Sequence, residues 1–158
     1  MRLVRATKEG YVLHLGKREK PLFCDLIKLY PRIPSSHRAN LSKTGQIPNQ
    51  EENQKLLDDA LKESRAQNRK KVSHLLSDAK TFHELAAGWQ LTLSSADLEW
   101  LLQVLNDIRV GSWMRLGSPD TLFLNSITEE NALDYWAMEV AGHVQMQLLA
   151  ATHRKASR

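Results

Sequence analysis

The sequence has very little cysteine, since Cys24 is the only one among 158 residues. A single cysteine excludes a disulfide within the chain and any metal site built on paired cysteines, and it is typical of a reducing compartment. The neighbouring Leu22, Phe23 and Leu26 predict that Cys24 is a thiol of the hydrophobic core and not a nucleophile.

Long hydrophobic runs are also missing. No apolar stretch approaches the roughly 20 residues that a membrane-spanning helix needs. The residues before Tyr11 lack the apolar segment of a secretory signal. We therefore expect a cytoplasmic protein with no membrane partner.

The motifs of the common enzyme classes are absent too. The chain has no glycine-rich phosphate loop, no paired cysteines and no Gly-x-Ser-x-Gly element. Two helical pairs, Glu139 with His143 and His74 with Asp78, could each supply two ligands to a metal, but a third ligand would have to come from elsewhere. Such pairs are far more often surface contacts, so we expect no catalytic activity, no cofactor and no metal.

The composition is that of a folded domain. Apolar residues make up 42% of the chain, charged residues make up 25%, and there are four tryptophans. A chain of this length can bury a sufficient core as one domain, so we predict a single domain over residues 1–152 and a flexible basic tail over residues 153–158. The expected fold is mainly α, with an N-terminal β-hairpin packed on a bundle of four to five helices.

The first third of the chain predicts the hairpin and one helix. Residues 3–7 and 11–15 alternate between apolar and polar side chains around a short turn that ends in a glycine. Pro21 suits the first turn of a helix that Pro31 brings to an end. Residues 31–48 then predict a long basic loop.

Residues 49–87 have a helical composition throughout. Asn49 followed by Glu52 predicts a helix start of the capping-box type. A single helix of that length would be about 57 Å long at 1.5 Å per residue, against roughly 40 Å across a compact domain of this size. It must therefore project or break. Because residues 62–71 offer only Ala66 as an apolar side chain, we favour a solvated midsection over a projecting basic stalk, and whether there is one helix or two stays open.

Two further helices follow an extended segment at residues 89–93. Ser94 as N-cap and Asp97 three residues later mark the start of the first helix, which should end at Gly117. The last helix should cover residues 128–152, with its apolar side chains turned toward the core.

The first of these two helices contains the most informative segment of the chain. Asn106, Asp107 and Arg109 lie among apolar residues, and burial of such side chains is costly unless each has a partner. At helical spacing Arg109 can reach Asn106 and the ring of Trp113, whereas Asp107 needs a partner from another helix. We predict that these four residues form a polar network that cross-links helices. The alternative is that Asp107 and Arg109 line a small pocket for an anionic ligand.

Charge is distributed unevenly along the chain. Residues 1–48 contain ten Lys and Arg against three Asp and Glu, whereas residues 89–152 contain two against eight. Opposed charges favour contact within the monomer or between two copies, and an acidic half disfavours a dedicated nucleic-acid binder. The basic side chains that could contact nucleic acid are Arg32, Arg38, Lys43, Arg65, Arg69, Lys70 and Lys71.

The segments Tyr11-Val-Leu-His-Leu, Tyr30-Pro-Arg-Ile and Leu105-Asn-Asp-Ile-Arg109, with Arg115-Leu-Gly after them, lie at separate points of the chain. Together they resemble a family of uncharacterised bacterial proteins known as a domain of unknown function, in which the Leu-Asn-Asp-x-Arg element is the distinctive part. Members are often encoded beside the Clp-protease adaptor, and some are labelled transcriptional regulators. The resemblance implies a cytoplasmic helical protein and supplies no established activity.

We therefore expect a non-enzymatic cytoplasmic protein that binds another protein or has a regulatory role, with a link to regulated proteolysis. The alternative is a nucleic-acid-binding transcriptional regulator that uses the basic N-terminal half, and an enzyme that uses Asp107 and Arg109 ranks third. A homodimer is a further expectation. Large side chains of the types enriched at interfaces support it, namely Trp113, Trp136, Met138 and Met146.

Overall fold

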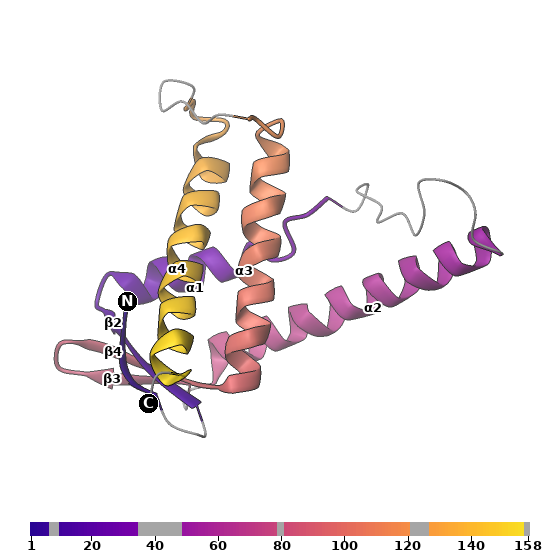
Figure 1. Cartoon of the computed structure of the whole chain (residues 1–158). Helices are drawn as coiled ribbons and strands as arrows, with labels where there is room; N and C mark the ends of the chain where they lie inside the picture. Colours follow the sequence, from indigo (N-terminus) through magenta and orange to yellow (C-terminus); the bar gives the residue numbers. More distant parts are fainter. Residues whose placement is uncertain (7–9, 35–48, 79–80, 121–126, 157–158) are drawn as a thin grey trace.

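The computed structural model describes residues 1–6, 10–34, 49–78, 81–120 and 127–156. Within these ranges the chain forms four helices and one antiparallel sheet of four strands in the order β1-β2-β4-β3 (Figure 1). The elements are β1 (Arg2–Ala6), β2 (Gly10–Gly16), α1 (Glu19–Ile27), α2 (Gln50–Ser77), β3 (Phe82–Leu85), β4 (Gly88–Ser94), α3 (Ser95–Arg115) and α4 (Ala132–Ala156). The fold is thus mixed α and β: the expected N-terminal hairpin and four helices are present, and the expectation is corrected by a second hairpin that completes a four-stranded sheet.

The predicted N-terminal hairpin is confirmed. β1 pairs with β2 in antiparallel register, and the side chains of β2 alternate, with Tyr11, Leu13 and Leu15 buried. This period of two is the pattern expected of a strand with one face on the core.

A second hairpin, β3–β4, lies where the sequence predicted the end of a long helix and an extended segment. α2 ends at Ser77, and β4 pairs with β2 along its whole length. Gly88 makes this pairing possible, because it has φ +149° and an added Cβ would lie 2.3 Å from the carbonyl oxygen of Leu15. The prediction of helix to residue 87 is therefore wrong, whereas the extended segment at 89–93 is confirmed as part of β4.

The helix boundaries follow the predicted signals only in part. At α3 the Ser94 side chain accepts a hydrogen bond from the backbone N–H of Asp97 at 3.0 Å, as predicted for an N-cap. Asn49 precedes α2 in a left-handed conformation and makes no side-chain cap, so the predicted capping box is wrong. α4 begins at Ala132 and continues to Ala156, so residues 153–156 of the predicted tail are helical.

The hydrophobic core lies between the sheet and the helices α1, α3 and α4. These helices lie together on one side of the sheet, and α3 and α4 run side by side (Figure 1). Fully buried leucines from β2, β4 and α3 meet there, including Leu13, Leu91 and Leu101. Burial of this kind stabilises a fold by roughly 25 cal/mol per Å² of apolar surface.

α2 extends away from this core as one unbroken helix of 28 residues, about 42 Å long (Figure 1). Its buried residues, Val72 and Leu75, lie near its C-terminal end. Leu56, near the other end, is 63% exposed. The structure therefore has a projecting helix, whereas the sequence analysis favoured a solvated midsection over a projecting stalk.

The C-terminal part of α2 is fixed to α3 by polar contacts. Trp100 donates its indole N–H to the Asn68 side chain at 2.9 Å, and Asn68 donates to the hydroxyl of Tyr30 at 3.2 Å. Lys71 forms an ion pair with Asp97 at 2.7 Å and lies over the ring of Trp100. These contacts determine where α2 leaves the body of the molecule.

Candidate functional site

The partner of Asp107 is a backbone segment, not another helix as the sequence predicted. One oxygen of the Asp107 carboxylate accepts hydrogen bonds from the backbone N–H groups of Arg32, at 2.6 Å, and Ile33, at 3.3 Å. Gly111 lies one turn further along α3, and an added Cβ there would be 2.4 Å from backbone atoms of the same two residues. Asp107 and Gly111 therefore hold the segment after α1 tightly against α3.

An ionic cluster around a buried carboxylate fixes the same segment to α4. The Arg32 guanidinium binds the carboxylate of Asp134, which is 7% exposed, and Arg115 from α3 approaches the same carboxylate at 3.2 Å. We call Arg32, Arg115 and Asp134 the Asp134 cluster. A buried carboxylate with two cationic partners is the arrangement expected of a structural ion pair, because an unpaired charge would be strongly destabilising.

The four residues of the predicted polar network do not form one network. Arg109 donates to the Asn106 side chain at 3.3 Å on the surface of α3, while Trp113 donates its indole N–H to the carbonyl of Pro119 at 3.1 Å. In the described parts of the chain the cation–π contacts are made by Lys20 and Lys71, so the predicted contact of Arg109 with Trp113 is wrong. Asp107 points to a different partner, and the predicted anion pocket between Asp107 and Arg109 is not formed.

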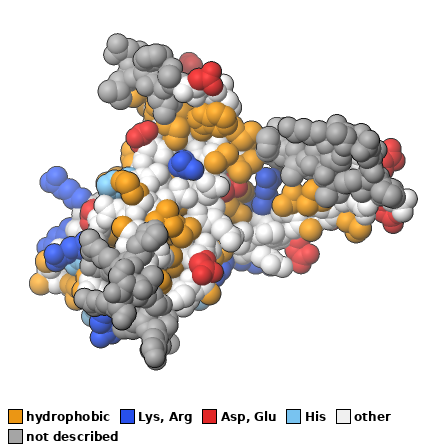
Figure 2. Space-filling view, in the orientation of Figure 1, with side chains coloured by type: hydrophobic (Ala, Val, Ile, Leu, Met, Phe, Trp, Pro, Cys, Tyr) orange, Lys and Arg blue, Asp and Glu red, His pale blue; other side chains and the backbone are white. Residues whose placement is uncertain are grey.

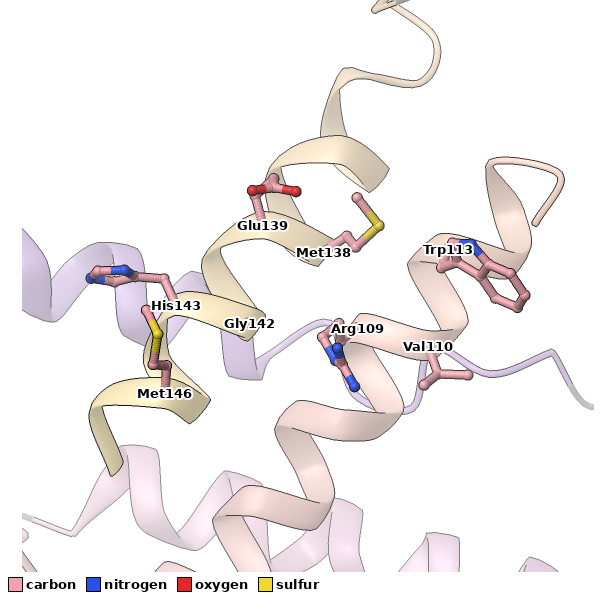
Figure 3. A pocket seen from close by; sticks show the side chains of 8 residues that line it. All are labelled: Arg109, Val110, Trp113, Met138, Glu139, Gly142, His143 and Met146. Atoms are coloured by element: carbon pink, nitrogen blue, oxygen red, sulfur yellow. The ribbon is translucent and has the colours of Figure 1, made fainter. Parts of the chain in front are cut away.

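Arg109 and Trp113 instead line a groove between α3 and α4 with a volume of about 630 Å³ (Figure 3). From α3 the groove is lined by Arg109, Val110 and Trp113. From α4 it is lined by Met138, Glu139, Gly142, His143 and Met146.

A second hollow of about 490 Å³ continues the groove along α4. It shares Arg109, Gly142 and Met146 with the first hollow and adds side chains such as Leu149. Gly142 leaves the floor between the two hollows open, since the nearest side-chain atom to an added Cβ would be Cδ of Arg109 at 3.6 Å. We call the two hollows together the α3–α4 groove.

The exposed face of α4 is unusually apolar. Residues 132–152 contain two charged side chains, Asp134, which belongs to the buried cluster, and Glu139. Met146 is 61% exposed and Leu149 is 46% exposed. In Figure 2 hydrophobic side chains gather over the region of α3 and α4, with few charged ones among them. A surface helix normally has charged residues on its outer face, so this face has the character of an interface.

Of the seven basic residues predicted to contact nucleic acid, two of the five that the structure describes are engaged in ion pairs. Arg32 is part of the Asp134 cluster, and Lys71 pairs with Asp97, whose pKa it lowers together with a hydrogen bond from Ser94. The side chains that remain on α2 are Arg65, Arg69 and Lys70. Arg38 and Lys43 lie outside the described residues.

The described residues contain no group of three or more His, Cys, Asp or Glu side chains that could hold a metal ion. Burial raises the pKa of the Cys24 thiol, and Cys24 packs against the core, as predicted. Within the described ranges, the helices also lack the combination of length and apolar character that a transmembrane segment requires.

Comparison with known proteins adds no relative, because no family model, curated protein or solved structure matches this chain. A function must therefore be inferred from the geometry of the α3–α4 groove. The sequence pattern predicted roles for Arg109, Trp113 and Met146, whereas Gly142 and Leu149 were not predicted. The low number of charged side chains in residues 132–152 could have indicated that Gly142 and Leu149 lie on an apolar surface.

Proposed function

We propose that this chain is a non-enzymatic binding protein that holds a helix of a partner protein in the α3–α4 groove. The observation that carries the proposal is the exposed apolar face of α4 beside a groove with Arg109 at its centre. Trp, Met and Arg are the side-chain types enriched at protein interfaces, and the flexible Met side chain adapts to different partners.

The shape of the groove favours a helix as its occupant. The α4 residues that line it extend from Met138 to Ala150, which is about 18 Å of helix or three turns. This length accommodates the i, i+4 and i+7 side chains with which an amphipathic helix binds an apolar groove. The partner helix should also present a carboxylate, because the exposed Arg109 guanidinium has Asn106 as its partner within the described residues.

The partners to test first are proteins of regulated proteolysis, because the family that the sequence resembles is often encoded beside the Clp-protease adaptor. A nucleic-acid-binding regulator is the weaker alternative, since Arg32 and Lys71 are engaged in ion pairs with carboxylates.

The proposal is tested by affinity capture with the full chain and two matched variants. Met146→Glu introduces a carboxylate into the groove at a position that is 61% exposed, and Leu56→Glu makes the same change on α2 at a position that is 63% exposed. Neither side chain is buried, so both variants should fold like the wild type.

We expect a partner that is captured by the wild type and by Leu56→Glu and is lost with Met146→Glu. With the purified partner, calorimetry should show an affinity at least about tenfold lower for Met146→Glu, which corresponds to about 1.4 kcal/mol. Equal capture by all three proteins, or no capture of any protein, a second copy of this chain included, would contradict the proposal.

A further inference from the structure

We infer that a second copy of this chain occupies the α3–α4 groove and that the two α4 helices cross in antiparallel orientation at Gly142. This inference rests on the proposed function, because it names a partner for the same groove. A two-fold dimer of this kind requires one surface that is complementary to itself. The α3–α4 groove and α4 meet this requirement in apolar character and in charge.

α4 is itself the kind of helix that the groove should bind. It presents Met146 and Leu149 to the exterior, and its exposed face carries Glu139 as a carboxylate. The apolar outer face of one copy would fill the groove of the other, and each groove would be filled in the same way. The contact therefore closes with two copies and leaves neither groove open.

The charges of the groove complement each other between two copies. Arg109 and Glu139 line the same hollow, yet within the described residues neither forms an ion pair in its own chain. Arg109 lies against Gly142, and Glu139 precedes Gly142 by three residues, about 4.5 Å along the helix. In an antiparallel crossing at Gly142, the Glu139 carboxylate of each copy comes within reach of the Arg109 guanidinium of the other. Two equivalent ion pairs result.

Gly142 sits at the centre of this arrangement. Residue 142 is midway along the weakly charged segment 132–152, so a crossing there brings the whole apolar face into contact. The absence of a side chain at the crossing point allows two helices to approach closely. About the same axis, Met146 of one copy lies over the end of the other groove that the mostly buried Met138 lines, since each residue lies four positions from Gly142.

The test uses two charge-reversal variants, Arg109→Glu and Glu139→Arg, in analytical ultracentrifugation from low to high micromolar concentration. Wild type should be dimeric at the upper end of this range. Each variant alone should be monomeric, because its dimer would place two like charges together in both ion pairs. An equimolar mixture of the two variants should restore the dimer, because the heterodimer re-forms both opposite-charge pairs. Only a contact between chains can produce this rescue.

A third variant, Gly142→Leu, tests the crossing point. In the isolated chain an added Cβ at Gly142 would contact Cδ of Arg109 at an ordinary 3.6 Å, and Gly142 lines the open groove, so we expect the variant to fold. It should abolish the dimer while the circular dichroism spectrum stays that of the wild type.

The outcomes separate this inference from the proposed function. A wild type that is monomeric throughout, or a dimer that all three variants leave intact, overturns the inference. In either case, loss of partner capture by Met146→Glu would still support the groove as a protein-binding site. A monomeric wild type together with capture that is insensitive to Met146→Glu would overturn both.

Discussion

At the scale of single residues, Asp107 and Gly111 show how a polar side chain inside an apolar helix can serve the fold. The Asp107 carboxylate satisfies two backbone N–H groups of the segment after α1, and Gly111 leaves space for that segment to lie against α3. Arg32 in the same segment then reaches Asp134 on α4. Three elements are thus joined at one point, and we assign Asp107 a structural role.

The substitution Asp107→Ala should therefore destabilise the protein. It leaves two partly buried N–H groups without their acceptor, at a cost of about 1 to 3 kcal/mol. For a chain of this size the midpoint of thermal unfolding should fall by about 3 to 10 °C. Glu99→Ala, an exposed change on the same helix, is the control and should leave the midpoint nearly unchanged. If both variants melt like the wild type, the hydrogen bonds of Asp107 do not contribute to stability.

Two glycines of the helix pair should respond to alanine in opposite directions. An added Cβ at Gly111 would overlap the backbone of Arg32 and Ile33 at 2.4 Å, so Gly111→Ala should destabilise the fold by about 1 to 3 kcal/mol or more. At Gly142 the Cβ has room, and alanine should stabilise the helix by up to about 1 kcal/mol. Urea unfolding in dilute solution measures both changes. A smaller loss for Gly111→Ala than for Gly142→Ala would contradict the close packing at Gly111.

At the scale of elements, the sequence predicted those helices and strands whose formation depends on a local residue pattern. The alternation in residues 11–15 and the N-cap at Ser94 are local signals, and the structure confirms both. The β3–β4 hairpin was missed because Ala86 and Ala87, at its turn, are good helix formers that extend the helical composition before them. Only the pairing of β4 with β2, which is a tertiary contact, overrides that propensity.

Less of the candidate site could be predicted from the sequence, because the site is formed by tertiary contacts between distant segments. The sequence singled out Arg109 and Trp113 as notable, but their common groove exists only because α3 packs beside α4. The acceptor role of Asp107 could not be predicted from side-chain spacing, since its partners are backbone N–H groups 75 and 74 residues away. The buried position of Asp134 was hidden in the same way, because its two arginine partners come from distant segments.

The two ends of α2 should differ in stability. The C-terminal part is held by Asn68, Lys71 and two buried apolar residues, whereas the N-terminal part extends from the body. Amide hydrogen exchange followed by mass spectrometry should therefore show fast exchange over residues 53–65 and slower exchange over residues 69–77.

The variant Asn68→Ala should extend fast exchange toward the C-terminal end of α2, because it removes the link between Tyr30 and Trp100. Gln67→Ala, which alters an exposed neighbour, is the matched control. Uniform protection along the whole of α2 in the wild type would contradict this prediction, because it would show that the N-terminal part is stabilised as firmly as the C-terminal part.

At the scale of the whole molecule, the fold separates an apolar face from charged ones. The groove and the exposed face of α4 carry little charge, while three basic side chains, Arg65, Arg69 and Lys70, lie on α2. These three side chains could contact the phosphates of a nucleic acid, but phosphate contacts alone do not distinguish one nucleic-acid sequence from another and give weak binding at physiological salt.

We therefore expect any binding of nucleic acid to be non-specific. Fluorescence anisotropy with two labelled duplexes of equal length and unrelated sequence should give equal, weak affinities that fall steeply as salt rises from about 50 to 200 mM. Tight binding of one duplex over the other at physiological salt would favour the transcriptional-regulator alternative.

The central claim is that the α3–α4 groove is a protein-binding surface, and site-specific photo-crosslinking in living cells tests it most directly. A photoreactive phenylalanine analogue would replace Leu149, at the edge of the groove, or Leu56, on the exposed part of α2, in two otherwise identical full-length proteins. We predict a cross-linked protein, either a second copy or a distinct partner, from position 149 and none from position 56. Cross-links from position 56 alone, or equally from both positions, would contradict the claim.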